Sequence, residues 1–404
     1  MPNIVQQKRQ KLALEGGTPV RANLLPYSRQ SIDAEDISGI SEVLRSDWLT
    51  TGPMVPAFEQ AFATFTNAEH AVAVSNGTAA LHAAMHAAGI KEGDEVIVPA
   101  MTFAATANAV LYCGGTPVFV DSDPDSLLID PEKVHAALSK KTKAIVAVDY
   151  AGHPCDYDTL RAISDRHKIT LIADGCHAVG GSYKGRPVGS LADMTCFSFH
   201  PVKPMTTGEG GMITTGNKQF AERMKKFRNH GITSDHRQRH EEGSWFYAME
   251  ELGFNYRLTD FQSALGMTQL THVPEWTKRR QEIAKRYDAA FVSIAQIKPL
   301  TVLTDISHAY HLYVILLQSN ACTADREKFF KALRMENIGV NVHYIPVHTH
   351  PYYTKRFGVR EGLCPVAEAA YKQIISIPIF SGMSDQDAED VIEATKKVCQ
   401  AYAR

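Results

Sequence analysis

Short apolar runs rich in β-branched residues recur along the first half of the chain. Seven of them predict strands, at 71–75 (AVAVS), 95–99 (EVIVP), 117–121 (PVFVD), 144–149 (AIVAVD), 170–174 (TLIAD), 195–199 (TCFSF) and 211–215 (GMITT). Helical patterns lie between most of them, at 79–88, 104–112, 131–140 and 156–167. Strands that alternate with helices predict a largely parallel sheet, and near-continuous apolar strands indicate burial on both faces. The gap before the last run is too short for a crossover helix, so one strand there is expected to be antiparallel.

The second half of the chain has a different pattern. A long helical stretch at 259–293 leads out of the sheet, and Pro274 is expected to break or kink it. A strand, a helix, a strand and two helical patterns follow, at 310–317, 324–336, 340–345, 365–373 and 384–401. We interpret these elements as a smaller α+β domain. Because single cores stop growing near ~250–300 residues, we expect a loose arm at 1–25, a large domain at 26–280 and a small domain at 281–404.

Composition excludes several classes of protein. Apolar residues make up 44% and charged residues 21%, which is typical of a globular chain. The net charge of −2 offers no basic excess for nucleic acid. The longest clean apolar run, at 312–317, is too short to span a membrane, and the polar N-terminus lacks the apolar core of a signal peptide. Seven cysteines without a CxxC pair favour a reducing cytoplasm.

Candidate chemistry follows three of the predicted strands, where ligands of parallel sheets bind. The turn SNGTAAL at 75–81 joins a strand to a helix, so free N–H groups and the Thr78 hydroxyl could bind an anion. An ordinary helix cap explains the same turn. Asp174 ends the strand TLIAD and could face a ligand or cap a helix, and His177 after it is by itself more typical of a structural histidine.

The strongest signal is the loop FSFHPVKPMTTGEGG at 197–211. Its Lys203 lies between two strands predicted to be buried, and desolvation lowers a lysine pKa toward nucleophilic use. An exposed loop lysine is the alternative. Together the anion site, the carboxylate and the lysine are the parts needed to bind pyridoxal 5′-phosphate, with the carboxylate on the pyridine nitrogen. Phe103, which follows EVIVP, could stack on the cofactor ring or simply pack in the core.

The chain contains, in order, seven recognisable motifs: SNGTAAL, PAMTFAATANAV, ADGCHAVGG, FSFHPVKPMTTGEGG, FRNHGI, ELGFNYRLTDFQSALG and NVHYIPVHTHPYY. They resemble the motifs of the DegT/StrS-type sugar aminotransferases, which are fold-type-I pyridoxal phosphate enzymes. The resemblance extends from about residue 26 to the C-terminus. It implies a homodimer with shared active sites, and a cofactor that alternates between pyridoxal and pyridoxamine 5′-phosphate.

The resemblance also implies roles for single residues. Lys203 corresponds to the Schiff-base lysine and Asp174 to the partner of the pyridine nitrogen. Other positions correspond to phosphate ligands (Thr78, Ala79, Ser198), the ring-stacking aromatic (Phe103), a His/Gln position beside the ring (His177), an asparagine that reaches the partner subunit's cofactor (Asn255) and a substrate-side stretch (His343, Tyr344, His348). A metal site at His343, His348 and His350 is disfavoured because no carboxylate or cysteine companion is apparent.

The reaction implied is transfer of an amino group from L-glutamate to the ketone of a nucleotide-linked sugar. Because Lys203 is not replaced by the histidine of related dehydratases, transamination is favoured. Several phrases are most similar to enzymes that aminate C4 of a UDP-linked 4-keto-6-deoxy sugar on the route to pseudaminic acid. The N-terminal LALEGGTPVR is more like cyclitol aminotransferases, so a 3-keto sugar or keto-cyclitol with glutamine as donor is an alternative. A dehydratase or lyase on the same fold and a non-catalytic regulatory protein are further alternatives.

Overall fold

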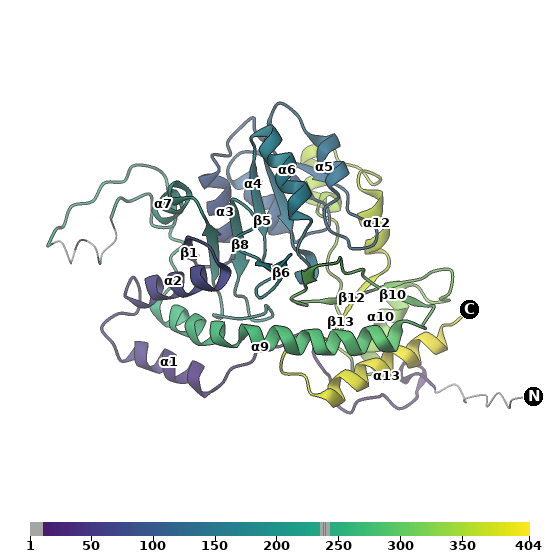
Figure 1. Ribbon diagram of the computed structural model, residues 1–404. Coiled ribbons are helices and arrows are strands. Elements are labelled where there is room, and N and C mark those ends of the chain that lie inside the picture. The colour runs from purple at the N-terminus through teal and green to yellow at the C-terminus, as the bar shows by residue number, and fades with distance from the viewer. Residues whose placement is uncertain (1–10, 235–236, 238, 240–242) are drawn as a thin grey trace, which may run out of the picture.

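The computed structural model describes residues 11–234, 237, 239 and 243–404. All seven predicted strands form, in one sheet of order β1-β9-β8-β5-β4-β2-β3. Figure 1 labels β1, β8 and β5 of this sheet. Their bounds are His70–Val74 (β1), Glu95–Pro99 (β2), Thr116–Val120 (β3), Thr142–Val148 (β4), Thr170–Asp174 (β5), Met194–Ser198 (β8) and Gly211–Thr215 (β9). Strand β9 is antiparallel to both neighbours, and the other pairs are parallel. The predicted mostly parallel sheet and its single reversed strand are therefore confirmed.

The helices around this sheet form three contacting sets. Helix α3 (Gly77–Ala87) contacts α4 (Ala104–Tyr112) and α7 (Lys218–Phe227), and α5 (Pro131–Ala137) contacts α6 (Tyr157–His167). Helices α1 (Ala34–Leu44) and α2 (Met54–Thr66) pack on the long helix α9 (Asp260–Phe291). Helices α1, α2 and α7 were not among the elements predicted from the sequence. The predicted helices of the sheet region all form, although α5 ends three residues early.

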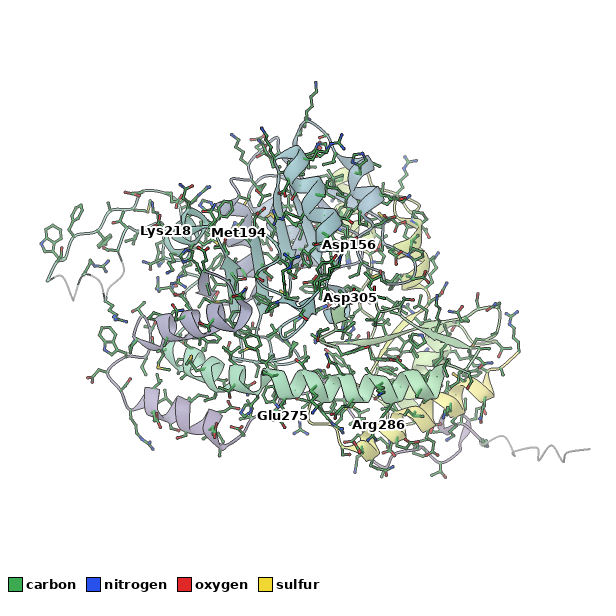
Figure 2. The ribbon with its side chains drawn as sticks, in the orientation of Figure 1. Asp156, Met194, Lys218, Glu275, Arg286 and Asp305 are labelled. Carbon is green, nitrogen blue, oxygen red and sulfur yellow. The ribbon has the colours of Figure 1, made fainter. Side chains whose placement is uncertain are left out.

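Helix α9 is continuous over 32 residues, with Pro274 inside it. The predicted break is therefore wrong, and the alternative of a kink stays a prediction. Proline removes one helical hydrogen bond, but packing holds both halves of α9: its first turns contact α1 and α2, and its later turns contact α13 (Asp385–Ala401). Arg286 of α9 pairs with Asp385 at 2.6 Å where the two helices meet (Figure 2). Tertiary contacts thus outweigh the local preference of proline.

The C-terminal part has its own sheet, of order β10-β12-β13, and its helices α10 and α13 contact each other. Its elements are β10 (Ile297–Pro299), β12 (Tyr313–Leu317), β13 (Ile374–Ile377), α10 (Arg326–Met335), α11 (Pro351–Phe357) and α12 (Pro365–Tyr371). Short strands β6 (Ser182–Tyr183), β7 (Arg186–Pro187) and β11 (Ile306–Ser307) form a third sheet. The predicted strand at 340–345 does not form. Within this segment only Asn341 forms a β-bridge, to Ser376.

Residues 11–25 are packed against the small region rather than loose. Leu12 and Leu25 are buried in its hydrophobic cluster. The buried carboxylate of Glu336 accepts hydrogen bonds from the N–H groups of Ala13 and Val20, both at 2.9 Å. These long-range contacts have no local sequence pattern, so the arm could not be recognised as bound.

Two hydrophobic clusters share the chain. The larger surrounds the seven-stranded sheet, and the smaller joins the arm, the end of α9 and the C-terminal helices. Side chains of the α11–α12 region, such as Tyr353 and Ala367, belong to the larger cluster. The two cores therefore interleave along the chain, and the domain boundary after residue 280 stays a prediction. No helix in the described ranges is both long and apolar enough to cross a membrane.

Candidate active site

A cavity of about 1000 Å³ lies at the carboxyl edge of the large sheet. Its wall includes residues that directly follow β1, β2, β5 and β8, as expected for a ligand site in a parallel sheet. The structure brings nine of the predicted site residues to this wall. They are Thr78, Ala79, Phe103, Asp174, His177, Ser198, Lys203, His343 and Tyr344.

Lys203 lies in the tight loop between β8 and β9. Its backbone N–H donates to the carbonyl of His200 at 2.9 Å, and Thr206 Oγ1 donates to the carbonyl of Phe199 at 2.9 Å. The Lys203 side chain has no hydrogen-bond or ion-pair partner among the described residues. Burial lowers the pKa of its amine, while Cys176 and Asp174 oppose this shift. A lowered pKa enlarges the neutral, nucleophilic fraction of the amine.

Asp174 is buried at the end of β5 and held by a chain of hydroxyls. Thr106 Oγ1 donates to Asp174 Oδ2 at 2.7 Å, and Thr106 and Thr102 are joined by a 2.7 Å hydrogen bond. The N–H of Cys176 donates to Oδ1 at 3.3 Å. Thr106 was not among the residues predicted from the sequence. Its signal was its place on the same predicted helix that follows Phe103, one turn along.

The start of α3 forms the anion end of the cavity. Asn76 is the N-cap, and its Oδ1 accepts the N–H of Ala79 at 2.8 Å. The Ala79 N–H is thus already bonded, whereas the first helical residues Gly77 and Thr78 have N–H groups without intrahelical partners. A Cβ on Gly77 would lie 2.8 Å from the Cβ of Ser198, so glycine is what permits this close approach.

Two aromatic side chains meet at the opposite wall. His177 Nδ1 accepts the N–H of Ala151 at 3.2 Å, and His177 Nε2 is 2.9 Å from the hydroxyl of Tyr344. Burial, with the charges of Lys203 and His343, holds the pKa of His177 well below its usual range. Burial raises the pKa of the Tyr344 hydroxyl. Both groups therefore stay uncharged near neutral pH.

His343 is held beside them. Its Nδ1 is 2.9 Å from the hydroxyl of Ser376, and burial lowers its pKa to about 4. Phe103 lies at the entrance with 59% of its surface exposed, 5.8 Å from the Tyr344 ring. A face of Phe103 is thus free to stack on a planar ligand, which stays a prediction.

Two predicted site residues lie elsewhere. Asn255 is exposed on a β-bridge to Asn229 and does not line the cavity of its own chain. His348 is fully buried, and its Nε2 is 2.8 Å from Glu368 Oε1. His348 therefore does not line this cavity, and its substrate-side role stays a prediction. Glu368, twenty residues further along, is a carboxylate companion that sequence reasoning missed, but no group of three metal-binding side chains occurs in the described part.

Other wall residues carried no recognisable signal in the sequence. His311 is the clearest: its ring lies 4.4 Å from that of His177, and it reaches the cavity from the segment before β12. Further wall residues come from distant parts of the chain and were likewise missed: Tyr27, His82, Tyr112, Tyr256 and Asn341.

The arrangement fits pyridoxal phosphate on observations of this structure. An unpartnered, partly buried amine, a buried carboxylate and a helix start lined by hydroxyls share one cavity. The amine can bind the aldehyde of the cofactor, the carboxylate can bind its pyridine nitrogen, and the helix start can bind its phosphate.

Comparisons with known proteins agree with this fit. The profile of the DegT/DnrJ/EryC1/StrS aminotransferase family matches residues 30–396. The spore coat polysaccharide biosynthesis protein SpsC of Bacillus subtilis is 43% identical over 380 residues, which are 94% of this chain and 98% of SpsC. Helicobacter pylori PseC, an aminotransferase involved in the biosynthesis of pseudoaminic acid, superposes with a TM-score of 0.88 at 31% identity, covering 94% of this chain and 100% of PseC. The sugar aminotransferase Spr1654 of Streptococcus pneumoniae, in its PMP form, superposes with a TM-score of 0.88 at 32% identity, covering 93% of this chain and 99% of Spr1654.

Proposed function

The chain belongs to the DegT/DnrJ/EryC1/StrS aminotransferase family, and from that premise we propose that it transfers the amino group of L-glutamate to C4 of a UDP-linked 4-keto-6-deoxy sugar. The broader activity is shown: the protein is a pyridoxal phosphate-dependent sugar aminotransferase. The observation that carries it is the free amine of Lys203 in one cavity with the buried carboxylate of Asp174.

Each wall residue has a task in this proposal. When bound, pyridoxal phosphate supplies a carbonyl carbon that exchanges amino groups and a ring that withdraws electrons. Lys203 Nζ would hold the cofactor and, once free of it, would carry a proton to and from the substrate carbon as general base and acid. Asp174 keeps a proton on the pyridine nitrogen. Thr78 and Ser198 hydroxyls and the N–H groups at the start of α3 bind the phosphate.

The proposed acceptor rests on similarity to PseC and to the motifs of C4-aminating enzymes. The alternative of a keto-cyclitol or 3-keto sugar, with glutamine as donor, rests on the segment LALEGGTPVR. In the fold that segment packs against Glu336 and contributes no residue to the cavity wall. Its resemblance therefore says little about the acceptor, and the C4 ketone is the better supported choice. The cytoplasmic location stays a prediction.

A spectrum of the purified holoenzyme tests the proposal. We expect the yellow band of the lysine-bound cofactor to convert to the pyridoxamine form on addition of L-glutamate. Lys203→Ala should lack that band and lose at least about 10⁴-fold in turnover while keeping its far-UV dichroism, because it removes the binding amine and the proton carrier together. A band that ignores glutamate but responds to glutamine would contradict the proposed donor. Multiple turnovers by Lys203→Ala would contradict the mechanism.

A further inference from the structure

The contact between Ala151 and His177 fixes which imidazole nitrogen carries the hydrogen. The N–H of Ala151 points at His177 Nδ1, 3.2 Å away. A backbone N–H can only donate, so Nδ1 must offer its lone pair. A protonated imidazolium would place a second hydrogen in this contact and cannot have this geometry. His177 is therefore neutral, with its hydrogen on Nε2.

This hydrogen sets the direction of the next bond. Nε2 of His177 lies 2.9 Å from the Tyr344 hydroxyl. Since Nε2 carries the hydrogen, His177 donates and the oxygen of Tyr344 accepts. The hydrogen of Tyr344 then has to point elsewhere, and it has no acceptor among the described residues. Tyr344 lines the cavity, so its O–H is left for a ligand there.

The small region holds Ala151, whose N–H begins this series of hydrogen bonds, firmly in place. Ala151 has a φ of 60°, and its carbonyl accepts the N–H of Leu312 at 3.1 Å. The carbonyl of Gly152 accepts the N–H of Ala309 at 2.9 Å. Gly152 has a φ of +98°, and a Cβ there would meet backbone atoms of His177, Tyr310 and His311 at 2.8–3.1 Å. The segment that leads into β12 thus locks Ala151 against His177.

We propose that Tyr344 is a catalytic residue that presents its O–H to an oxygen of the bound ligand, in a direction fixed by Ala151 and His177 as positioning residues. This inference rests on the proposed function, because the ligand oxygen belongs either to the cofactor ring or to the ketone of the acceptor sugar. A fixed donor stabilises negative charge that develops on such an oxygen without reorganising during the reaction. The contact is a hydrogen bond, and no proton leaves Tyr344.

Three variants of the holoenzyme test the direction of the hydrogen bonds that run from Ala151 through His177 to Tyr344. Tyr344→Phe removes the donor and keeps the ring. His177→Gln preserves the polarity, because its carbonyl can accept from Ala151 while its amide donates to Tyr344. His177→Glu reverses it, because a carboxylate accepts from both sides and turns the Tyr344 hydrogen away from the cavity. Tyr353→Phe is the matched control, since it loses a buried 2.6 Å hydroxyl bond to Asn108 and Tyr353 does not line this cavity.

Two readouts separate the two ligand oxygens. If the donor serves the cofactor ring, Tyr344→Phe shifts the pH midpoint of the cofactor's visible band, before any substrate is added. If it serves the ketone, the band titrates as in the wild type, and the reaction of the pyridoxamine form with the keto sugar slows by about 10²-fold, the usual effect of losing one such donor. In both cases Tyr353→Phe remains close to the wild type, His177→Gln loses less than Tyr344→Phe, and His177→Glu follows Tyr344→Phe.

The proposal is overturned if Tyr344→Phe changes neither readout, or if His177→Gln loses as much as Tyr344→Phe. If His177→Glu does not bind the cofactor, the comparison of Tyr344→Phe with His177→Gln still tests the proposal. The ¹⁵N shifts of histidine-labelled holoenzyme, assigned by comparison with His177→Gln, give a direct check, and a protonated Nδ1 would contradict the inference. The cofactor titration needs no amino donor, so failure of the glutamate reaction in the wild type would refute the proposed donor and leave this test intact.

Discussion

Asp174 illustrates which features of a site side chain could be predicted from the sequence and which could not. Its type and its place at the end of a strand were visible in the sequence. The hydroxyls that orient it were not, because Thr106 approaches from another element and bonds Oδ2 at 2.7 Å. A buried carboxylate depends on such donors to replace its hydration.

We expect Asp174→Asn to lower turnover by about 10²–10³-fold, since a neutral amide cannot hold a proton on the pyridine nitrogen electrostatically. Thr106→Val should lower it by roughly tenfold, because a hydrogen bond to a charged group contributes about 1.5–3 kcal/mol. Steady-state kinetics with a keto sugar acceptor measures both. Thr195→Val is the control, since the buried Thr195 hydroxyl has no partner in the described part of the chain. Equal rates for Thr106→Val and Thr195→Val would refute the role of Thr106.

At the scale of elements, the start of α3 is defined by its packing against β8. The turn before α3 serves as an N-cap and as an anion end at once, so the two alternatives raised by the sequence are compatible. Asn76 caps Ala79, and Gly77 allows the helix to approach Ser198 closely. The first two N–H groups of α3 remain for a phosphate.

Gly77→Ala should therefore weaken cofactor binding. The added Cβ meets Ser198 Cβ at 2.8 Å and Cys176 Sγ at 3.3 Å, so the helix start must shift away from these two side chains and its N–H groups move with it. Overpacking of this kind costs about 1–3 kcal/mol, which corresponds to a rise in the cofactor Kd of roughly tenfold or more. Titration of the apoenzyme with pyridoxal phosphate measures it. Gly216→Ala, where the new Cβ has no heavy atom within 4 Å, is the control and should bind as the wild type does.

The end of α10 carries a second element-scale prediction. Glu336 is fully buried, accepts two N–H groups of the arm and pairs with the buried amine of Lys397 at 2.8 Å. Glu336→Gln leaves Lys397 without its counter-charge, which costs about 3–5 kcal/mol for a buried pair. Denaturant unfolding should show this loss. Glu327→Gln on the same helix breaks an exposed pair with Lys331 and should cost less than about 1 kcal/mol. Similar losses in both variants would contradict the structural role of the arm.

At the scale of the whole molecule, one predicted site residue has no role within its own chain. Asn255 is exposed outside the cavity, next to a run with exposed apolar side chains at Trp245, Phe246, Met249 and Leu252. This segment projects from the body of the molecule (Figure 1). The homodimer implied by the resemblance would give these side chains a partner, and it remains our proposal.

Mixing two inactive variants tests the shared site. Asn255→Ala and Lys203→Ala should each be impaired as pure proteins, by lost phosphate binding and lost amine. If Asn255 serves the partner's cofactor, the mixed dimer contains one site with both residues intact. Activity should then rise on co-refolding or subunit exchange, toward about a quarter of the wild-type level if the subunits associate at random. No recovery in a mixture shown to contain mixed dimers would contradict the shared site.

The sequence by itself determined what depends on local order: the seven strands, their mostly parallel arrangement, and the lysine, carboxylate and turn that follow three of them. Those features repeat within a few residues, and a parallel sheet brings the ends of its strands to one edge. Tertiary structure decided the rest. Pro274 stays inside a helix because neighbours hold both sides, and the arm is bound because Glu336 lies more than 300 residues away. His348 turns to Glu368, and Ala151 fixes the hydrogen of His177, because such contacts join distant segments whose meeting no local pattern records.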